Sequence, residues 1–277
     1  MGEFFTLDYN NCNLTVKNIH CLCLDYTLDC GQSFRWYKND EGHWCAVVNG
    51  KYAELSQESP DTITFFNCTE DEFNNFWIHY FDLDRDYDKI LNCYKEDPNL
   101  REAINKYYGI RILNQDPWEA LCSFIISQNN NIPRIKGIIN RLCEAYGDKL
   151  PNGEYTFPLA ETLARLEPED LAPIRAGFRN KYIIDAARKV ASGEINLDKI
   201  KVLPLENAEA QLLKIKGVGP KVAQCALLYG CGQIDAFPID VWVKRIMAEL
   251  YPNGMPECCR GTMGIAQQYL FHWRRNI

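Results

Sequence analysis

The stretch LLKIKGVGPKVAQCALLYG, residues 212–230, decides the fold of the chain. It places two glycines and a proline within four positions, Gly217 to Pro220, between two apolar runs. Glycine permits positive φ and the close approach of a partner, and proline presets φ at the first position of a helix, where its missing N–H is not needed. The pattern therefore predicts a helix, a tight hairpin and a second helix.

The hairpin is also a candidate anion site. Unpaired N–H groups at a helix N-terminus bind anions, so the backbone at Gly217 and Gly219 is expected to hold a phosphate. Lys221 follows directly, and it could be a surface lysine that helps to hold this phosphate. Because the first turn of a helix carries partial positive charge, an inward-facing lysine there is instead suited to be an uncharged Schiff-base nucleophile.

A carboxylate follows the hairpin in the run AFPIDVWVKRI, at Asp240. An aspartate before an apolar run is the usual N-cap of a helix, and this explanation accounts for the residue fully. A carboxylate at a helix N-terminus also stays ionised, and it could stabilise positive charge that develops on a sugar. The roles of cap and catalyst are compatible.

The composition predicts a globular chain with an uneven distribution of charge. Of the 277 residues, 47% are apolar and 24% are charged, with a net charge of −7. Residues 1–100 hold 7 Lys and Arg against 18 Asp and Glu, whereas residues 101–277 hold 23 against 19. Binding of nucleic acid depends on the local field, so the second part is left free to bind DNA. No apolar run approaches the ~20 residues of a membrane span, and we expect no membrane partner.

The thirteen cysteines are scattered and odd in number, and none has CxxC spacing. This favours free thiols in a reducing intracellular compartment and argues against a zinc site. Near the end only Cys258 and Cys259 occur, side by side, so we expect no iron–sulfur cluster.

The first hundred residues predict an α+β domain built on an antiparallel sheet, residues 1–99. Asn49-Gly50 in HWCAVVNGKYAELS is a strong hairpin signal, and TITFF, residues 62–66, is typical of a further strand. The run TEDEFNNFWIHYF, residues 69–81, begins with a capping Thr69 and predicts a helix.

Residues 100–277 predict an all-α domain. Asp116 and Pro117 mark the N-terminus of a helix, and apolar positions recur at helical spacing in residues 132–146, before Gly147, and in residues 180–191, before Gly193. A last helix is expected in GTMGIAQQYLFHWRR, residues 261–275.

Taken together, these residues resemble the helix-hairpin-helix/Gly-Pro-Asp superfamily of DNA glycosylases, and more specifically the 8-oxoguanine DNA glycosylase/AP lyase family. The hairpin with its lysine and the aspartate 19 positions later carry the resemblance. Four other matches support it in order along the chain: GQSFRW at 31–36, DPWE with SFIISQNNNI within 116–132, GFRNKY at 177–182 and GIAQQYLF at 264–271. The matches span roughly residues 20–272, and the short chain resembles a bacterial member.

The resemblance implies a bifunctional enzyme that excises 8-oxoguanine from duplex DNA, preferentially opposite cytosine. Lys221 would attack the sugar and form a Schiff base, with Asp240 assisting attack and base loss, and β-elimination would then cleave the strand. No cofactor would be needed. The expected partner is double-stranded DNA that contains 8-oxoguanine, and the expected form is a monomer in the cytoplasm, associated with the nucleoid.

The resemblance also assigns binding roles. Gly31 would accept a hydrogen bond from N7–H of the lesion through its carbonyl, Cys225 and Phe271 would sandwich the extruded base, and Gln267 would read its Watson–Crick edge. The cytosine left behind would be read by Asn129, Arg134 and Arg179, with Phe178 filling the gap. A structural monovalent cation is implied at the main chain of Leu213, Ile215 and Val218.

Without the resemblance, each of these binding residues has an ordinary structural explanation. Gly31 could be a plain turn, Cys225 and Phe271 helix core, and Gln267 a solvated helix position. Asn129 could simply end a helix, and the two arginines could contact phosphates.

Two positions depart from the pattern of the animal enzymes. Phe178 stands where they have a tyrosine, so the ring is kept and its hydroxyl is lost. Trp242 stands where they have a histidine that contacts phosphate, and that role is not carried over. Neither position belongs to the set of residues expected to read the lesion.

Two other functions fit parts of the same pattern. A monofunctional alkyl-purine DNA glycosylase on this fold would need only the aspartate. A non-enzymatic helix-hairpin-helix module would use the hairpin for phosphate contact alone.

Overall fold

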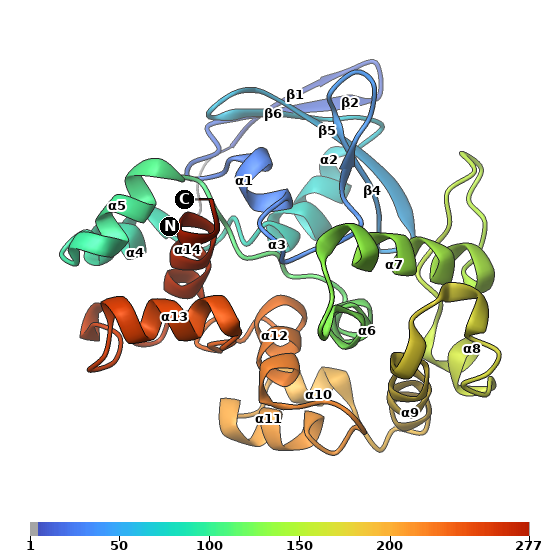
Figure 1. Ribbon diagram of the computed structural model, residues 1–277. Helices are drawn as coiled ribbons and strands as arrows, with labels where there is room; N and C mark the ends of the chain where they lie inside the picture. Colours follow the sequence, from blue (N-terminus) through green and yellow to red (C-terminus); the bar gives the residue numbers. More distant parts are fainter. Residues whose placement is uncertain (1–4, 277) are drawn as a thin grey trace.

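The N-terminal strands form one six-stranded antiparallel sheet in the order β1-β2-β6-β5-β4-β3 (Figure 1). The structure is a computed structural model that describes residues 5–276. The strands are β1 Thr6–Asn10, β2 Asn13–Lys17, β3 Tyr37–Lys38, β4 Trp44–Val48, β5 Lys51–Ser59 and β6 Thr62–Phe65. The sheet predicted for this part of the chain is confirmed.

The Asn49-Gly50 turn joins β4 to β5 as expected. Both residues have positive φ, 50° and 75°, and Val48 pairs with Lys51 across the turn. Positive φ at both central positions is the conformation that follows the twist of a hairpin, and it explains the choice of asparagine and glycine.

The helical run predicted over residues 69–81 is present with a widened middle. It consists of α2 Glu70–Glu72, the π-helical turn η1 Phe73–Trp77 and α3 Ile78–Tyr80. Thr69 caps it by accepting a hydrogen bond from the Glu72 N–H at 3.1 Å. Phe73 and Trp77 are buried, and both pack with Phe65 in the core beneath the sheet. A short α1, Leu24–Leu28, packs with the same core.

The rest of the chain is helical, as predicted, and lies below the sheet in Figure 1. The longer helices are α4 Tyr87–Tyr94, α5 Pro98–Lys106, α6 Pro117–Ser127, α7 Ile132–Tyr146, α9 Asn180–Ala191, α11 Leu205–Leu212, α12 Pro220–Gly230, α13 Val241–Leu250 and α14 Met263–Arg275. Short turns of helix occur at α8 Ala160–Ala164, η2 Ala172–Ile174, η3 Gly177–Arg179, α10 Leu197–Lys201 and η4 Glu257–Cys259.

The predicted helix boundaries are confirmed by cap geometry. The Asp116 carboxylate accepts from the Glu119 N–H and the Asp240 carboxylate from the Val243 N–H, both at 2.8 Å. Helix α7 ends at Gly147, and α9 is followed by Gly193, which has φ +77°. In residues 5–276 no helix is long and apolar enough to cross a membrane.

The two parts share side chains across their boundary. Leu113 packs with the core of the sheet, whereas Cys30 and Phe34 pack with the core of the helices. Helix α14 runs back along α5 and ends beside α1 (Figure 1). The division expected at residues 99 and 100 stays a prediction.

A buried arginine ties two N-terminal segments, at residues 20–21 and 82–85, to the start of the helical part. The Arg111 side chain is 0% exposed. Its guanidinium donates to the main-chain carbonyls of His20 and Cys21 at 2.9 Å each, and to those of Asp82 and Arg85. A buried cation is tolerated when its N–H groups are satisfied in this way.

We predict that Arg111→Met lowers the free energy of unfolding by about 3–5 kcal/mol, because several buried carbonyls lose a charged donor. Urea denaturation measures the change. The matched control is Arg101→Met at an exposed position of α5, where the expected change is within about 0.5 kcal/mol. Equal stability of the two variants would contradict the structural role of Arg111.

Candidate active site

The predicted hairpin joins α11 to α12. Gly217 has φ +79°, and a Cβ there would lie 2.4 Å from the ring of Tyr182, so both its conformation and its packing require glycine. The hairpin is held on α9, because the Asp185 carboxylate accepts from the Lys216 N–H at 2.7 Å. The backbone of Gly219 does not have the positive φ that was expected of the hairpin glycines. It has φ −101° as the N-cap of α12, and a Cβ there would meet nothing within 4 Å, so it leaves the helix end open to a partner.

Lys221 lies in the first turn of α12 and is half-buried. Its Nζ is 3.3 Å from Ser127 Oγ and 5.2 Å from the centre of the Phe124 ring, both on α6, against which α12 packs. Ser127 Oγ in turn donates to the Phe124 carbonyl at 2.8 Å. The amine is therefore held at the junction of two helices and does not extend into bulk solvent.

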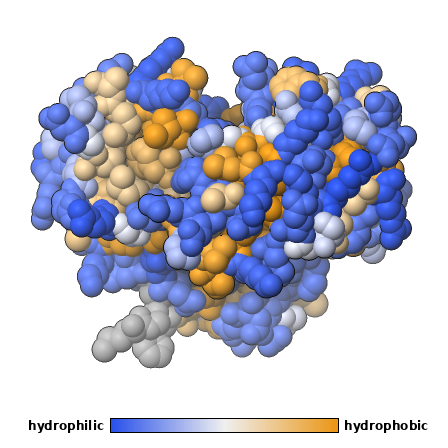
Figure 2. All heavy atoms as spheres, turned by 90° about the horizontal axis from the view of Figure 1, so that it is seen from below, coloured by the Kyte–Doolittle hydropathy of each residue, from blue (hydrophilic) through white to orange (hydrophobic). Residues whose placement is uncertain are grey.

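Lys221 and Asp240 line the same cavity, whose volume is about 820 Å³. Among the predicted site residues, Gly31, Asn129, Phe178, Gly219 and Phe271 also lie on its wall. The exposed apolar side chains of Phe178, Val241 and Trp242 add to this wall. Seen from below, apolar side chains gather near the middle of the molecule within a hydrophilic surround (Figure 2). The cavity can hold a planar base between apolar surfaces, beside an amine and a carboxylate.

Gly31 is placed in the cavity wall by hydrogen bonds on both sides of it. It has φ +85°, which favours glycine. On one side, the Gln268 amide of α14 donates to the Cys30 carbonyl at 3.1 Å. On the other side, the fully buried Gln32 donates to the carbonyls of Thr27 and Arg111 and accepts from the Leu113 N–H.

The three other predicted lesion-binding residues lie on α12 and α14. Phe271 lines the cavity and is half-buried, whereas Cys225 and Gln267 are 3% and 4% exposed and are not among the residues that line it. Burial raises the pKa of the Cys225 thiol to about 11, against the opposing effect of Lys221. Gln267 Oε1 is buried and accepts no hydrogen bond within the described chain. An unpaired buried acceptor is costly, so this oxygen is available for a ligand donor.

Of the residues predicted to face the opposite base, Asn129 and Phe178 line the cavity. Asn129 is exposed with φ +52° and follows the end of α6. Phe178 is 50% exposed and rests on Tyr182, the ring that also packs against Gly217. The protruding ring and the hairpin are thus supported by one aromatic side chain.

The two predicted arginines differ from each other. Arg134 is exposed, whereas Arg179 is 2% exposed and its guanidinium lies 4.4 Å from the centre of the Phe178 ring. Arg179 donates to the carbonyls of Gln128, Asn129 and Ala176. Burial and the charge of Arg134 lower the pKa of Arg179. In this structure Arg179 supports the loop that presents Asn129.

Sequence reasoning missed Ser127, Phe34, Gln32, Gln268 and Arg275. Phe124 and Ser127 share one face of α6 by their spacing, but only the packing of α6 on α12 reveals that this face meets Lys221. Arg275, at the end of α14, lines the cavity with no sequence signal other than its charge. Trp242 also lies on the wall, with the Arg245 guanidinium 5.4 Å from the centre of its ring.

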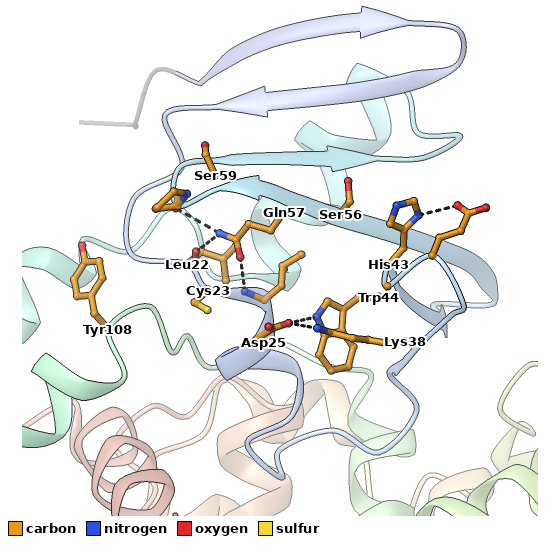
Figure 3. A pocket seen from close by; sticks show the side chains of 14 residues that line it. Leu22, Cys23, Asp25, Lys38, His43, Trp44, Ser56, Gln57, Ser59 and Tyr108 are labelled. Carbon is orange, nitrogen blue, oxygen red and sulfur yellow. Dashed lines mark hydrogen bonds and ion pairs between the residues drawn. The ribbon is translucent and has the colours of Figure 1, made fainter.

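A second hollow of about 550 Å³ lies beside the sheet and contains none of the predicted site residues (Figure 3). In this hollow the Asp25 carboxylate accepts from Trp44 Nε1 at 2.8 Å and pairs with Lys38 Nζ at 2.7 Å. The charges of Asp25 and Lys38 therefore neutralise one another.

The chain matches two known families along its length. Residues 13–121 match the N-terminal domain of 8-oxoguanine DNA glycosylase, and residues 122–256 match the HhH-GPD superfamily of base excision DNA repair proteins.

Named relatives agree with these matches. The N-glycosylase/DNA lyase of Saccharomyces cerevisiae is 33% identical over 83% of this chain and 68% of that protein. The DNA-3-methyladenine glycosylase of Bacillus subtilis is 38% identical over 70% of this chain and 66% of that protein. The chain thus spans about two thirds of the length of both relatives.

A solved structure resembles the whole chain. The 8-oxoguanine glycosylase/lyase of Clostridium acetobutylicum, in complex with double-stranded DNA that contains cytosine opposite 8-oxoguanine, is 38% identical. The similarity covers 99% of each chain with a TM-score of 0.92.

Proposed function

The chain belongs to the 8-oxoguanine DNA glycosylase family, and on that premise we propose how its residues excise the damaged base and cleave the strand. The protein is an N-glycosylase with DNA lyase activity on duplexes that contain 8-oxoguanine. The observation that carries the proposed mechanism is the half-buried Lys221 amine, which shares one cavity with Asp240, Gly31 and Phe271.

Binding begins at the hairpin. The N–H groups around Gly217 and Gly219 hold a phosphate, which fixes the duplex without reading its sequence. The damaged nucleotide then leaves the stack and enters the cavity, at a cost of a few kcal/mol. Phe178 fills the space that it leaves, since its ring already projects from a supported position.

Hydrogen bonds at the edge of the damaged base and stacking on its two faces recognise the lesion. The Gly31 carbonyl accepts from N7–H of 8-oxoguanine, whereas guanine presents an acceptor at N7 and is rejected. Gln267 Oε1, buried without a donor, accepts from the Watson–Crick edge. Phe271 stacks on one face of the base, and Cys225, kept as a thiol by its raised pKa, contacts the other.

The Lys221 amine then attacks C1′ through its nitrogen electron pair as the glycosidic bond breaks, and the bonding pair leaves with the base. Asp240 stabilises the positive charge that develops on the sugar. The attacking nitrogen releases one proton, which the departing base takes up. The bond between C1′ and O4′ then breaks as O4′ takes a proton from solvent, which leaves a protonated Schiff base, and removal of a C2′ proton allows β-elimination of the 3′ phosphate. Ser127 orients the amine through its 3.3 Å contact.

The sequence-based expectations on location and ions remain part of the proposal. A duplex substrate implies work at the chromosome, which is the nucleoid-associated location expected above. The monovalent cation expected at Leu213, Ile215 and Val218 would sit on the hairpin turn. Because the Ile215 carbonyl already accepts from the Val218 N–H at 3.1 Å, the ion would use its second lone pair.

We predict that Lys221→Gln retains binding of lesion DNA and loses both activities, because the nucleophile is removed and the cavity is kept. Borohydride trapping of the protein on 8-oxoguanine duplex measures the Schiff base. The matched control is Lys216→Gln on the same hairpin, which is exposed and should still be trapped. Trapping of the Lys221 variant would show that another group is the nucleophile. A wild-type protein that excises an alkylated purine without being trapped would support the monofunctional alternative.

Asp240→Asn is expected to slow base excision about 100-fold or more in single-turnover assays, since the charge is lost. Asparagine caps a helix as well as aspartate does, so the stability of the protein should be kept. Asp116→Asn, the same change at the N-cap of α6 outside the cavity, should leave the rate unchanged. An unaltered rate for the Asp240 variant would reduce this residue to a cap.

We also propose that cytosine is the preferred opposite base, read by Asn129 and Arg134 with Arg179 holding their loop. Arg134→Ala should then reduce the ratio of excision rates opposite cytosine and opposite adenine by about tenfold, the usual discrimination of a base-reading arginine. Rates on duplexes with each of the four opposite bases provide the measurement. Arg188→Ala, an exposed change on α9 where Arg188 pairs with Glu167, should leave the ratio unaltered. A ratio unaltered in both variants would remove Arg134 from the reading set.

A further inference from the structure

The last residue of α14 places a guanidinium beside the glycine that is proposed to recognise the lesion. Arg275 Nη1 lies 3.5 Å from the position that a Cβ of Gly31 would occupy, and the guanidinium lies 5.9 Å from the centre of the Phe271 ring. Arg275 is exposed and lines the cavity. Its neighbour Arg274 differs, since it pairs with Glu249 and does not line the cavity.

We propose that Arg275 is a specificity-determining residue that donates a hydrogen bond to O8 of 8-oxoguanine. This inference rests on the proposed function, because it takes its geometry from the contact between the Gly31 carbonyl and N7–H. N7 and C8 are adjacent atoms of the ring, so a base held at Gly31 by N7–H brings O8 close to the same glycine. A guanidinium beside Gly31 is therefore in position to reach that oxygen.

The chemistry of the two groups makes a two-point reading of the lesion. Oxidation turns N7 from an acceptor into a donor and C8–H into a carbonyl acceptor. Gly31 supplies the acceptor for the first change, and Arg275 supplies a donor for the second. Hydrogen bonds to a charged donor are about twice as strong as neutral ones, and the planar fork of arginine offers several N–H groups.

Arg275 alone would not discriminate, since guanine N7 also accepts from arginine. The Gly31 carbonyl removes this ambiguity because it repels the N7 lone pair of guanine. In 8-oxoguanine it accepts from N7–H, and the guanidinium is free to donate to O8. The two residues together therefore distinguish 8-oxoguanine from guanine on two adjacent atoms, whereas the Gly31 carbonyl alone would read only N7.

A simpler role for Arg275 is contact with a phosphate at the mouth of the cavity. The position beside Gly31 and Phe271, on the surface that meets the base, favours the contact with the lesion. The two roles differ in substrate dependence. A phosphate contact serves every bound duplex, whereas a contact with O8 is absent when the base is absent.

The test compares two substrates of the full chain, a duplex with 8-oxoguanine and the same duplex with a preformed abasic site. Arg275→Leu should slow single-turnover excision of 8-oxoguanine about tenfold and leave cleavage at the abasic site unchanged. Arg275→Lys, which keeps the charge and loses the planar fork, should retain part of the excision rate. Arg274→Leu, the adjacent control, should match the wild type on both substrates.

Two outcomes would overturn the assignment. An equal loss on both duplexes would identify Arg275 as a phosphate contact, and unchanged rates on both would leave it as a surface charge. Neither outcome bears on the proposed function, which is tested separately by excision and borohydride trapping of the wild-type protein. Thermal unfolding of each variant verifies that the fold is intact.

Discussion

The site depends on the hydrogen bonds that hold the loop Cys30–Gln32 between the sheet and the helices. The Gln268 amide binds the Cys30 carbonyl from α14, and the buried Gln32 amide binds the segment that starts the helical part. A buried amide without these partners would destabilise the fold, because its polar atoms would be left without hydrogen bonds. The loop therefore cannot shift without breaking a satisfied network. The position of Gly31 relative to Phe271 and Lys221 follows from this constraint, although neither glutamine touches the cavity.

A second series of contacts connects the hairpin, which is proposed to bind a DNA phosphate, to Phe178, which is proposed to fill the space left by the extruded base. Gly217 packs on the ring of Tyr182, and Phe178 packs edge to face on the same ring at 5.9 Å. Arg179, next to Phe178, donates to the main-chain carbonyls of Gln128 and Asn129. A phosphate at the hairpin, the projecting ring and the reading loop therefore keep fixed positions relative to one another. A nucleotide that leaves the stack finds these groups already placed, which reduces the ordering cost of the bound state.

The sequence predicted the elements well and the contacts between them poorly. Caps and turns are local, so Asp116, Asp240, Asn49-Gly50 and Pro117 marked boundaries that the structure confirms. The resemblance to the glycosylase family identified candidate residues, several of which line one cavity. It did not indicate that Gln267 is buried with an unpaired oxygen, or that the N–H groups of Arg179 donate to main-chain carbonyls. These properties depend on which helix faces which, and residues more than 100 positions apart, such as Gly31 and Arg275, meet only in the folded chain.

The distribution of charge explains how an acidic chain can serve a polyanion. Of the described residues that line the cavity, the charged ones are Lys221, Asp240 and Arg275, whereas the excess of carboxylates belongs to residues 1–100. That segment contributes only Gly31 and Phe34 to the cavity wall. Because a phosphate responds to the nearby field, and distant surface charges are screened within about 10 Å at ordinary salt, the net charge of −7 does not oppose binding there. Asp240 lines the cavity together with the Lys221 amine and the Arg275 guanidinium. Its carboxylate caps the N-terminus of α13 at the place where, under the proposed function, the sugar becomes positive.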